Sequence, residues 1–151
     1  MVKTVLLARP HPFIVSEMKP FLEQGGFAVK KIASFAELPS SIAGISGTII
    51  SLAVASSVTK TPAEVFAEIH RAAPRVPVLF AAMLDFAKMR SELERLAKST
   101  GIETTILGVD PASENHPALG KPNTLLYLSK DDLTAPERRA IAARLIQRHF
   151  R

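Results

Sequence analysis

Short apolar runs alternate along this chain with longer stretches in which apolar residues recur at helical spacing. The strand-like runs are residues 5–8, 27–32, 48–55, 76–82 and 124–128. The helix-like stretches are residues 13–24, 62–73, 85–99 and 134–150, with a shorter one after Ser34. Runs that are apolar throughout, such as residues 48–55, are typical of strands covered by helices on both faces. The alternation predicts an open, mainly parallel α/β sheet with right-handed crossovers.

Capping patterns mark where three of these helices begin. Residues 34–37, 61–64 and 134–137 each place Ser or Thr three positions before Glu, which is the spacing of a capping box. A proline next to the cap strengthens the second and third assignments. Pro20 lies inside the first predicted helix, and we expect it to kink or loosen the second turn.

Residues 102–123 do not fit the regular alternation. Residues 102–109 contain enough β-branched side chains for a further strand, and residues 110–123 carry three prolines, a glycine and two asparagines. A loop of this length is usually functional or mobile. We therefore interpret the whole segment as an insertion into the α/β pattern.

Composition sets outer limits on the class of protein. The 151 residues are 47% hydrophobic, a length and composition suited to one domain, residues 1–151, with a sizeable core. The chain has no cysteine, which excludes disulfides and thiolate metal sites. No apolar run approaches the ~18 residues of a membrane span, and the N-terminal run is too short for a signal peptide. These features predict a soluble, cytoplasmic protein that is not associated with a membrane.

The positive charge is concentrated at the C-terminal end. The net charge is +5, and no carboxylate follows Glu137. Five arginines lie in this last segment: Arg138, Arg139, Arg144, Arg148 and Arg151. Three of them, Arg144, Arg148 and Arg151, share the helix face opposite the apolar arc. This face is either simply solvated or a surface that binds a partner.

Motifs of common enzymes are missing from the sequence. There is no Gly-x-Ser-x-Gly elbow, no Gly-x-Gly-x-x-Gly loop and no Gly-Lys-Ser/Thr motif. Asp110, Glu114 and His116 could contact a metal ion within one loop, but their spacing matches no known metal motif. We therefore expect no catalysis, no catalytic residues, no cofactor and no metal site.

Four segments together resemble the receiver domain of two-component response regulators. They are KTVLLARPHPFI with the following FLEQGGFAV, the strand at 48–55 with the helix at 62–73, PRVPVLFAA, and YLSKDDL with its tyrosine-x-x-lysine spacing. The resemblance implies a flavodoxin-like, three-layer α/β/α fold. It further implies a mainly parallel five-stranded sheet of order 2-1-3-4-5, with residues 102–123 inserted.

The residues that a phosphorylated receiver needs are largely replaced here. The resemblance implies an acidic pair for Mg²⁺ after the first strand, where this chain has Arg9 and Pro10. The phosphoacceptor aspartate falls on Val54, or on Leu52 after a two-residue shift. No Asp or Glu occurs anywhere in residues 38–63.

Of the two phosphate-contacting positions, only one is retained. The hydroxyl position falls on Ala82, whereas Lys130 matches the family lysine. The chain therefore resembles a degenerate pseudo-receiver that cannot be phosphorylated. Its expected function is protein–protein interaction in bacterial-type signal transduction. The family's docking face corresponds to residues 76–150 here, and a homodimer through this strand 4–helix 4–strand 5–helix 5 face is an expectation.

Two other functions remain open. Arg9 and Lys130, with hydroxyls from Ser56 and Ser57, could form a cationic pocket that senses a small anion or nucleotide. Alternatively, Arg144, Arg148 and Arg151 could bind nucleic acid. No aromatic side chains interleave with these arginines, so base stacking is not indicated.

Overall fold

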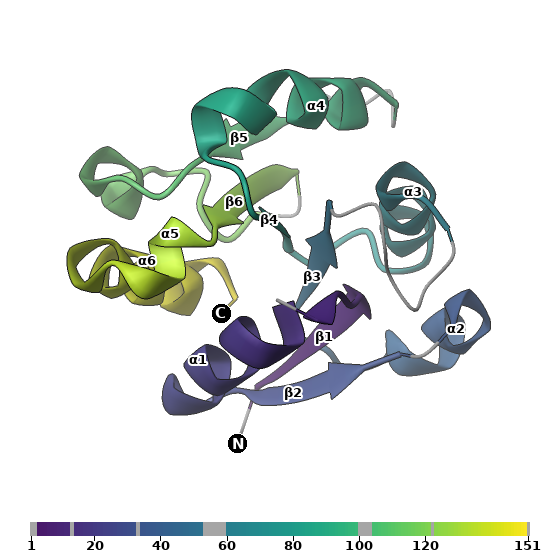
Figure 1. The fold of residues 1–151 in the computed structure, drawn as a ribbon. Coiled ribbons are helices and arrows are strands. Elements are labelled where there is room, and N and C mark those ends of the chain that lie inside the picture. The colour runs from purple at the N-terminus through teal and green to yellow at the C-terminus, as the bar shows by residue number, and fades with distance from the viewer. Residues whose placement is uncertain are drawn as a thin grey trace.

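A parallel sheet of six strands, in the order β2-β1-β3-β4-β6-β5, runs through the middle of the molecule (Figure 1). The computed structural model describes residues 3–12, 14–32, 34–52, 60–99, 104–121 and 123–150. The strands are β1 (Thr4–Arg9), β2 (Ala28–Lys31), β3 (Gly47–Ser51), β4 (Val78–Ala82), β5 (Thr105–Leu107) and β6 (Thr124–Ser129). The flavodoxin-like fold predicted from the sequence is confirmed.

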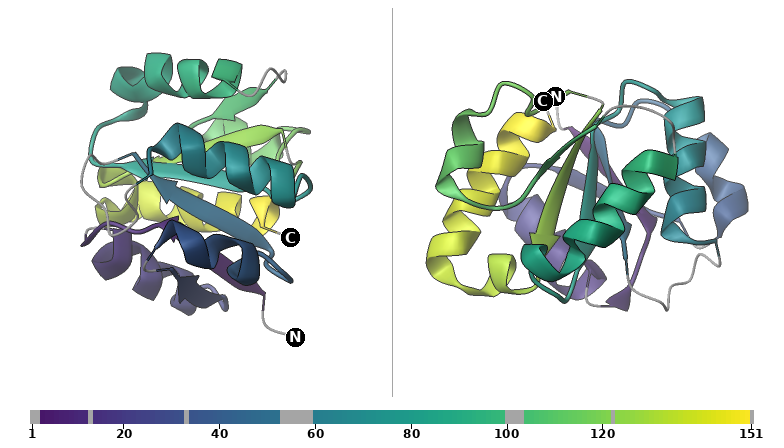
Figure 2. Two further views of the ribbon diagram at one scale, coloured as in Figure 1. Left: turned by 90° about the vertical axis from the view of Figure 1, so that its right-hand side faces the viewer. Right: turned by 90° about the horizontal axis from the view of Figure 1, so that it is seen from above.

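Helices cover both faces of this sheet (Figure 2). The α-helices are α1 (Lys19–Gln24), α2 (Leu38–Ser41), α3 (Pro62–Ala72), α4 (Phe86–Ser99), α5 (Asp131–Thr134) and α6 (Pro136–His149). Three short segments have other helical geometry: η1 (Ile14–Met18), η2 (Phe35–Glu37) and η3 (Pro111–Asn115). Among the described residues, no helix combines the length and the apolar character needed to cross a bilayer.

Alternating strand side chains build one apolar core on each face. Val5 and Leu7 of β1 point to the face covered by α1 and α6. Leu6 and Ala8 point to the opposite face, which α2, α3 and α4 cover. The central strands are buried on both faces, which explains why their sequences are apolar throughout rather than alternating.

The insertion adds a strand to the expected sheet. Numbering β6 as the fifth strand recovers the predicted order 2-1-3-4-5, and β5 then pairs with the outer edge of β6. Leu107, Val109 and Leu119 of this segment are buried in the core beneath α6. The expectation of five strands is thus one too low, because the insertion supplies an edge strand that is only three residues long.

Local sequence signals determine several of the helix starts. The Ser34 amide donates to Glu37 Oε2 at 2.8 Å, and Thr61 Oγ1 accepts from the Glu64 amide at 3.2 Å, as the capping patterns predicted. The prediction from the third pattern is wrong, because Thr134 does not cap α6. Thr134 is the last residue of α5, and its hydroxyl donates to the Lys130 carbonyl one turn earlier. Pro20 follows a π-helical turn, η1, where the missing proline amide disturbs regular α-helical bonding.

His149, at the end of α6, and Phe150 close the amino end of the sheet. His149 is fully buried; its Nδ1 accepts from the Gly120 amide at 3.2 Å, and its Nε2 lies 2.9 Å from the Val78 carbonyl oxygen. The neighbouring Phe150 ring lies over Gly47, where an added Cβ would be 2.1 Å from Phe150 Cδ1. A glycine is therefore required sterically at the start of β3.

Candidate functional site

The carboxyl ends of β1 and β3 form the point at which the strand order reverses. In open parallel sheets of this kind, ligands bind in the crevice at such a point. Arg9 is the last residue of β1 and Ser51 is the last residue of β3. The pairing between these strands shifts register just before this edge, so that Arg9 lies opposite Ile50. The position and contacts of the Arg9 side chain therefore determine which ligands the crevice could bind.

The Arg9 side chain is buried at this crevice and hydrogen-bonded to the backbone of the same chain. Only 4% of the residue is exposed. Its Nη1 donates to the Ser51 carbonyl at 2.9 Å, and its Nε donates to the Lys60 carbonyl at 2.9 Å. One guanidinium thereby ties β1 to both ends of the connection that runs from β3 to α3. This geometry is that of an internal brace.

The brace carries a positive charge. Burial lowers the pKa of the Arg9 guanidinium from its ordinary value, but arginine remains protonated in proteins. A fixed cation thus occupies the position that the receiver resemblance assigns to acidic ligands of Mg²⁺. The charge repels a second cation and leaves no carboxylate at this position to coordinate one.

Lys130, the other half of the predicted anion pocket, lies on the same edge of the sheet but apart from Arg9. It follows β6, and its side chain is exposed. Two strands, β3 and β4, separate β1 from β6, so the two backbones are roughly 14 Å apart at a spacing of about 4.8 Å per strand. Ser56 and Ser57 lie outside the described residues. The anion pocket therefore stays a prediction.

Sequence reasoning missed a buried carboxylate beside Lys130. Asp132 Oδ2 accepts from the Ser129 amide at 2.7 Å and from the Ser129 hydroxyl at 3.1 Å. Its Oδ1 accepts from Arg138 Nε at 2.7 Å. The spacing Ser129-x-x-Asp132 is itself a capping pattern and could have revealed this cluster. Both oxygens of this carboxylate are thus used to hold the start of α5 and α6 against β6.

A second carboxylate on this edge, that of Asp85, is also used locally. Its Oδ1 accepts from the Lys88 amide at 3.0 Å and so caps α4. Nearby, the Tyr127 hydroxyl donates to the Leu84 carbonyl. Burial raises the pKa of Tyr127, and the charges of Asp132 and Asp85 raise it further, so the phenol stays protonated at neutral pH.

The three residues of the insertion that could contact a metal ion make separate contacts in the fold. Asp110 Oδ1 accepts from the Ser113 amide, and His116 Nδ1 accepts from the Ala118 amide, both at 3.1 Å. The Glu114 carboxylate binds Arg144. Throughout the described residues, no group of three or more His, Asp or Glu side chains is arranged to hold a metal ion.

The arginines of α6 contact the insertion of the same chain. Arg144 donates from Nη2 to Glu114 Oε1 at 2.8 Å and from Nε to Glu114 Oε2 at 3.1 Å. Arg148 donates to the Glu114 carbonyl and to Asn115 Oδ1. Arg151 lies outside the described residues. The predicted partner-binding face therefore includes two arginines that hold η3 against α6.

We expect the Arg144–Glu114 pair to contribute modestly to stability, because both side chains are in contact with solvent. Arg144→Ala and Glu114→Gln should each lower the urea midpoint slightly, and the double variant should lose little more than either single variant. Both effects should shrink at high salt. Arg75→Ala, at an exposed arginine that makes no ion pair within the described residues, is the control. Additive losses would show that the two side chains act independently.

Solved structures of similar fold are response-regulator receiver proteins. The receiver domain protein of Clostridium thermocellum has a TM-score of 0.56 and 13% identity, covering 97% of this chain and 96% of that chain. The receiver protein of Sinorhizobium medicae has a TM-score of 0.53 and 16% identity, covering 97% of both chains. A CheY-like receiver domain protein of Methanospirillum hungatei has a TM-score of 0.54 and 12% identity, covering 97% of this chain and 99% of that chain.

The similarity in backbone structure extends over nearly the whole chain, whereas the sequence identity is low. No protein-family model matches the sequence, and no curated protein matches it. At identities of 12% to 16%, the similar structures show that this chain has a receiver-like fold.

Proposed function

We propose that this chain is a receiver-like protein-interaction module of a signalling pathway that does not accept a phosphoryl group. The observation that carries the proposal is the buried Arg9 guanidinium at the crevice between β1 and β3. Phosphoryl transfer in a receiver requires a divalent cation held by carboxylates next to an acceptor aspartate. Here a side chain of the protein supplies the positive charge, and residues 38–63 contain no carboxylate.

The remaining carboxylates on this edge do not substitute for the missing ones. Asp131 and Asp132 follow β6 and Asp85 follows β4, all on the far side of β3 from Arg9. Asp132 is engaged by Ser129 and Arg138, and Asp85 caps α4. A receiver-like fold without phosphotransfer retains its surfaces, and binding to another protein is the function that such surfaces support.

We expect the purified protein to keep its intact mass when it is incubated with acetyl phosphate and Mg²⁺. A receiver domain that autophosphorylates under the same conditions serves as the positive control. A phosphoryl adduct on this chain would overturn the proposal. Asp85→Asn, Asp131→Asn and Asp132→Asn variants would then show which of the carboxylates that follow β4 and β6 had reacted.

A homodimer through the docking face of receivers is not part of this proposal. In this chain β5 pairs with the outer edge of β6, and η3 lies against α6 through Glu114. The insertion thus covers the outer edge of β6 and contacts α6, both of which belong to the face on which that dimer was expected.

A further inference from the structure

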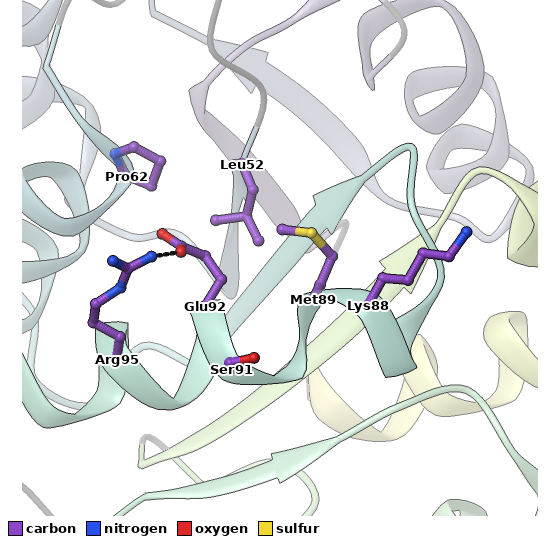
Figure 3. A pocket seen from close by; sticks show the side chains of 7 residues that line it. All are labelled: Leu52, Pro62, Lys88, Met89, Ser91, Glu92 and Arg95. Carbon is purple, nitrogen blue, oxygen red and sulfur yellow. Dashed lines mark hydrogen bonds and ion pairs between the residues drawn. The ribbon is translucent and has the colours of Figure 1, made fainter.

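An open groove of about 580 Å³ lies between the start of α3 and the side of α4 (Figure 3). Leu52, which follows β3, and Pro62, the first residue of α3, form one side of it. The other side consists of five residues of α4: Lys88, Met89, Ser91, Glu92 and Arg95. None of these residues takes part in the Arg9 brace or in the Asp132 cluster.

Two exposed apolar side chains lie in the turn between β4 and α4, near the groove. Ser51 pairs with Ala81, so Leu52 is level with Ala82 and next to the turn that follows β4. In that turn Met83 is 49% exposed and Leu84 is 50% exposed, and they are the exposed large hydrophobic residues of the described chain. Leu52 and Met89 line the groove itself, and this turn leads into α4, so exposed apolar side chains lie close to the groove in the chain, as at surfaces used for binding.

The charge on the groove is positive. Lys88, Glu92 and Arg95 are spaced so that they share one face of α4. Glu92 is neutralised by its ion pair with Arg95. Within the part of the chain that the structure describes, the exposed Lys88 ammonium makes no ion pair, which leaves it available to a carboxylate from outside.

We propose that this groove binds an acidic, amphipathic helix of a partner protein. Apolar residues of that helix would pack on Leu52, Met89 and the exposed Met83–Leu84 turn, and one of its carboxylates would pair with Lys88. A helix laid between two helices is an established mode of recognition. The open shape of the groove suits an elongated partner surface better than a small molecule enclosed on most sides. This inference rests on the proposed interaction function and assigns it a surface and a partner class.

The test uses three synthetic helical peptides that share one leucine stripe and carry Glu, Gln or Lys at the remaining positions. Fluorescence anisotropy measures their affinity for the full chain, and amide chemical-shift changes map where they bind. We expect the Glu peptide to bind best and to shift resonances of Leu52, Met89 and the Met83–Leu84 turn. Its affinity should fall as salt is raised.

Charge reversal at the groove gives the sharper measurement. Lys88→Glu should lower the affinity for the Glu peptide at least tenfold and raise the affinity for the Lys peptide. Lys98→Glu makes the same change on an exposed part of α4 outside the groove and should alter neither affinity. A Met83→Ser, Leu84→Ser double variant should weaken all three peptides. Circular dichroism confirms that each variant is folded.

Three outcomes would overturn the inference: no binding of the Glu peptide, binding that maps away from the groove, or equal effects of Lys88→Glu and Lys98→Glu. Each of these would leave the proposed function standing if the intact mass is unchanged by acetyl phosphate. A phosphoryl adduct would defeat the proposed function whatever the peptides do. The two failures are therefore distinguishable.

Discussion

Replacing Arg9 by methionine is expected to lower the free energy of unfolding by about 3 kcal/mol, because a charged hydrogen-bond donor to two carbonyl groups is lost. Methionine fills a similar length of space but offers no donor to the Ser51 and Lys60 carbonyl oxygens, each 2.9 Å from the guanidinium. The connection between β3 and α3 then loses its link to β1. Urea denaturation measures the change.

Two comparisons decide whether geometry or charge is responsible. Arg9→Lys keeps the charge but cannot place two donors in a fixed fork, so we expect it to recover only part of the loss. Arg75→Met removes an exposed arginine and should leave the urea midpoint unchanged. If Arg9→Met were as stable as the wild type, the guanidinium would not be a brace, and the anion-pocket interpretation of Arg9 would be favoured.

The second large effect is a loss of stability at mildly acidic pH through His149. Burial lowers the pKa of this imidazole from 6.5 to about 4, although its hydrogen bond to the Val78 carbonyl raises it slightly. As the pH is lowered, His149 is therefore protonated near pH 6.5 in the unfolded chain but only near pH 4 in the folded chain. The contribution of this shift to the free energy of unfolding is fully present above about pH 6.5. It is lost, by about 3 kcal/mol, as the pH is lowered from about 6.5 to about 4.

Urea denaturation of wild type and His149→Gln between about pH 7 and pH 4 tests this expectation. The glutamine variant loses some stability at pH 7, because its amide cannot reproduce both contacts, to the Gly120 amide and to the Val78 carbonyl. Its stability should then decline less steeply with acid than that of the wild type. Parallel curves for wild type and His149→Gln would contradict the assignment.

The order of the elements could be predicted because local patterns specify it. Apolar runs of strand length alternate with amphipathic stretches, and Thr61 and Ser34 mark helix starts through contacts only three residues apart. The strand β5 is a weaker case, since three residues give too short a pattern to distinguish an edge strand from a loop. At Thr134 a local pattern misled, because the short helix α5 comes first and uses that hydroxyl for its own last turn.

The chemistry of the candidate site depended on contacts that no local pattern reveals. The sequence placed Arg9 on the right edge, but its acceptors lie 42 and 51 residues further along the chain. Similarly, Arg144 meets Glu114 across 30 residues, so an arginine row that looks free in the sequence is partly engaged in the fold. Whether a cation faces a ligand or the protein's own backbone is decided by tertiary packing.

The brace at the crevice also bears on how such a protein could be controlled. In a receiver that binds a diffusible metal ion, the positive charge at the crevice is lost when a chelator removes that ion. The guanidinium of Arg9 belongs to the polypeptide and stays in place for as long as the chain is folded. The binding of a partner to this module is therefore expected to be independent of whether a divalent ion is present.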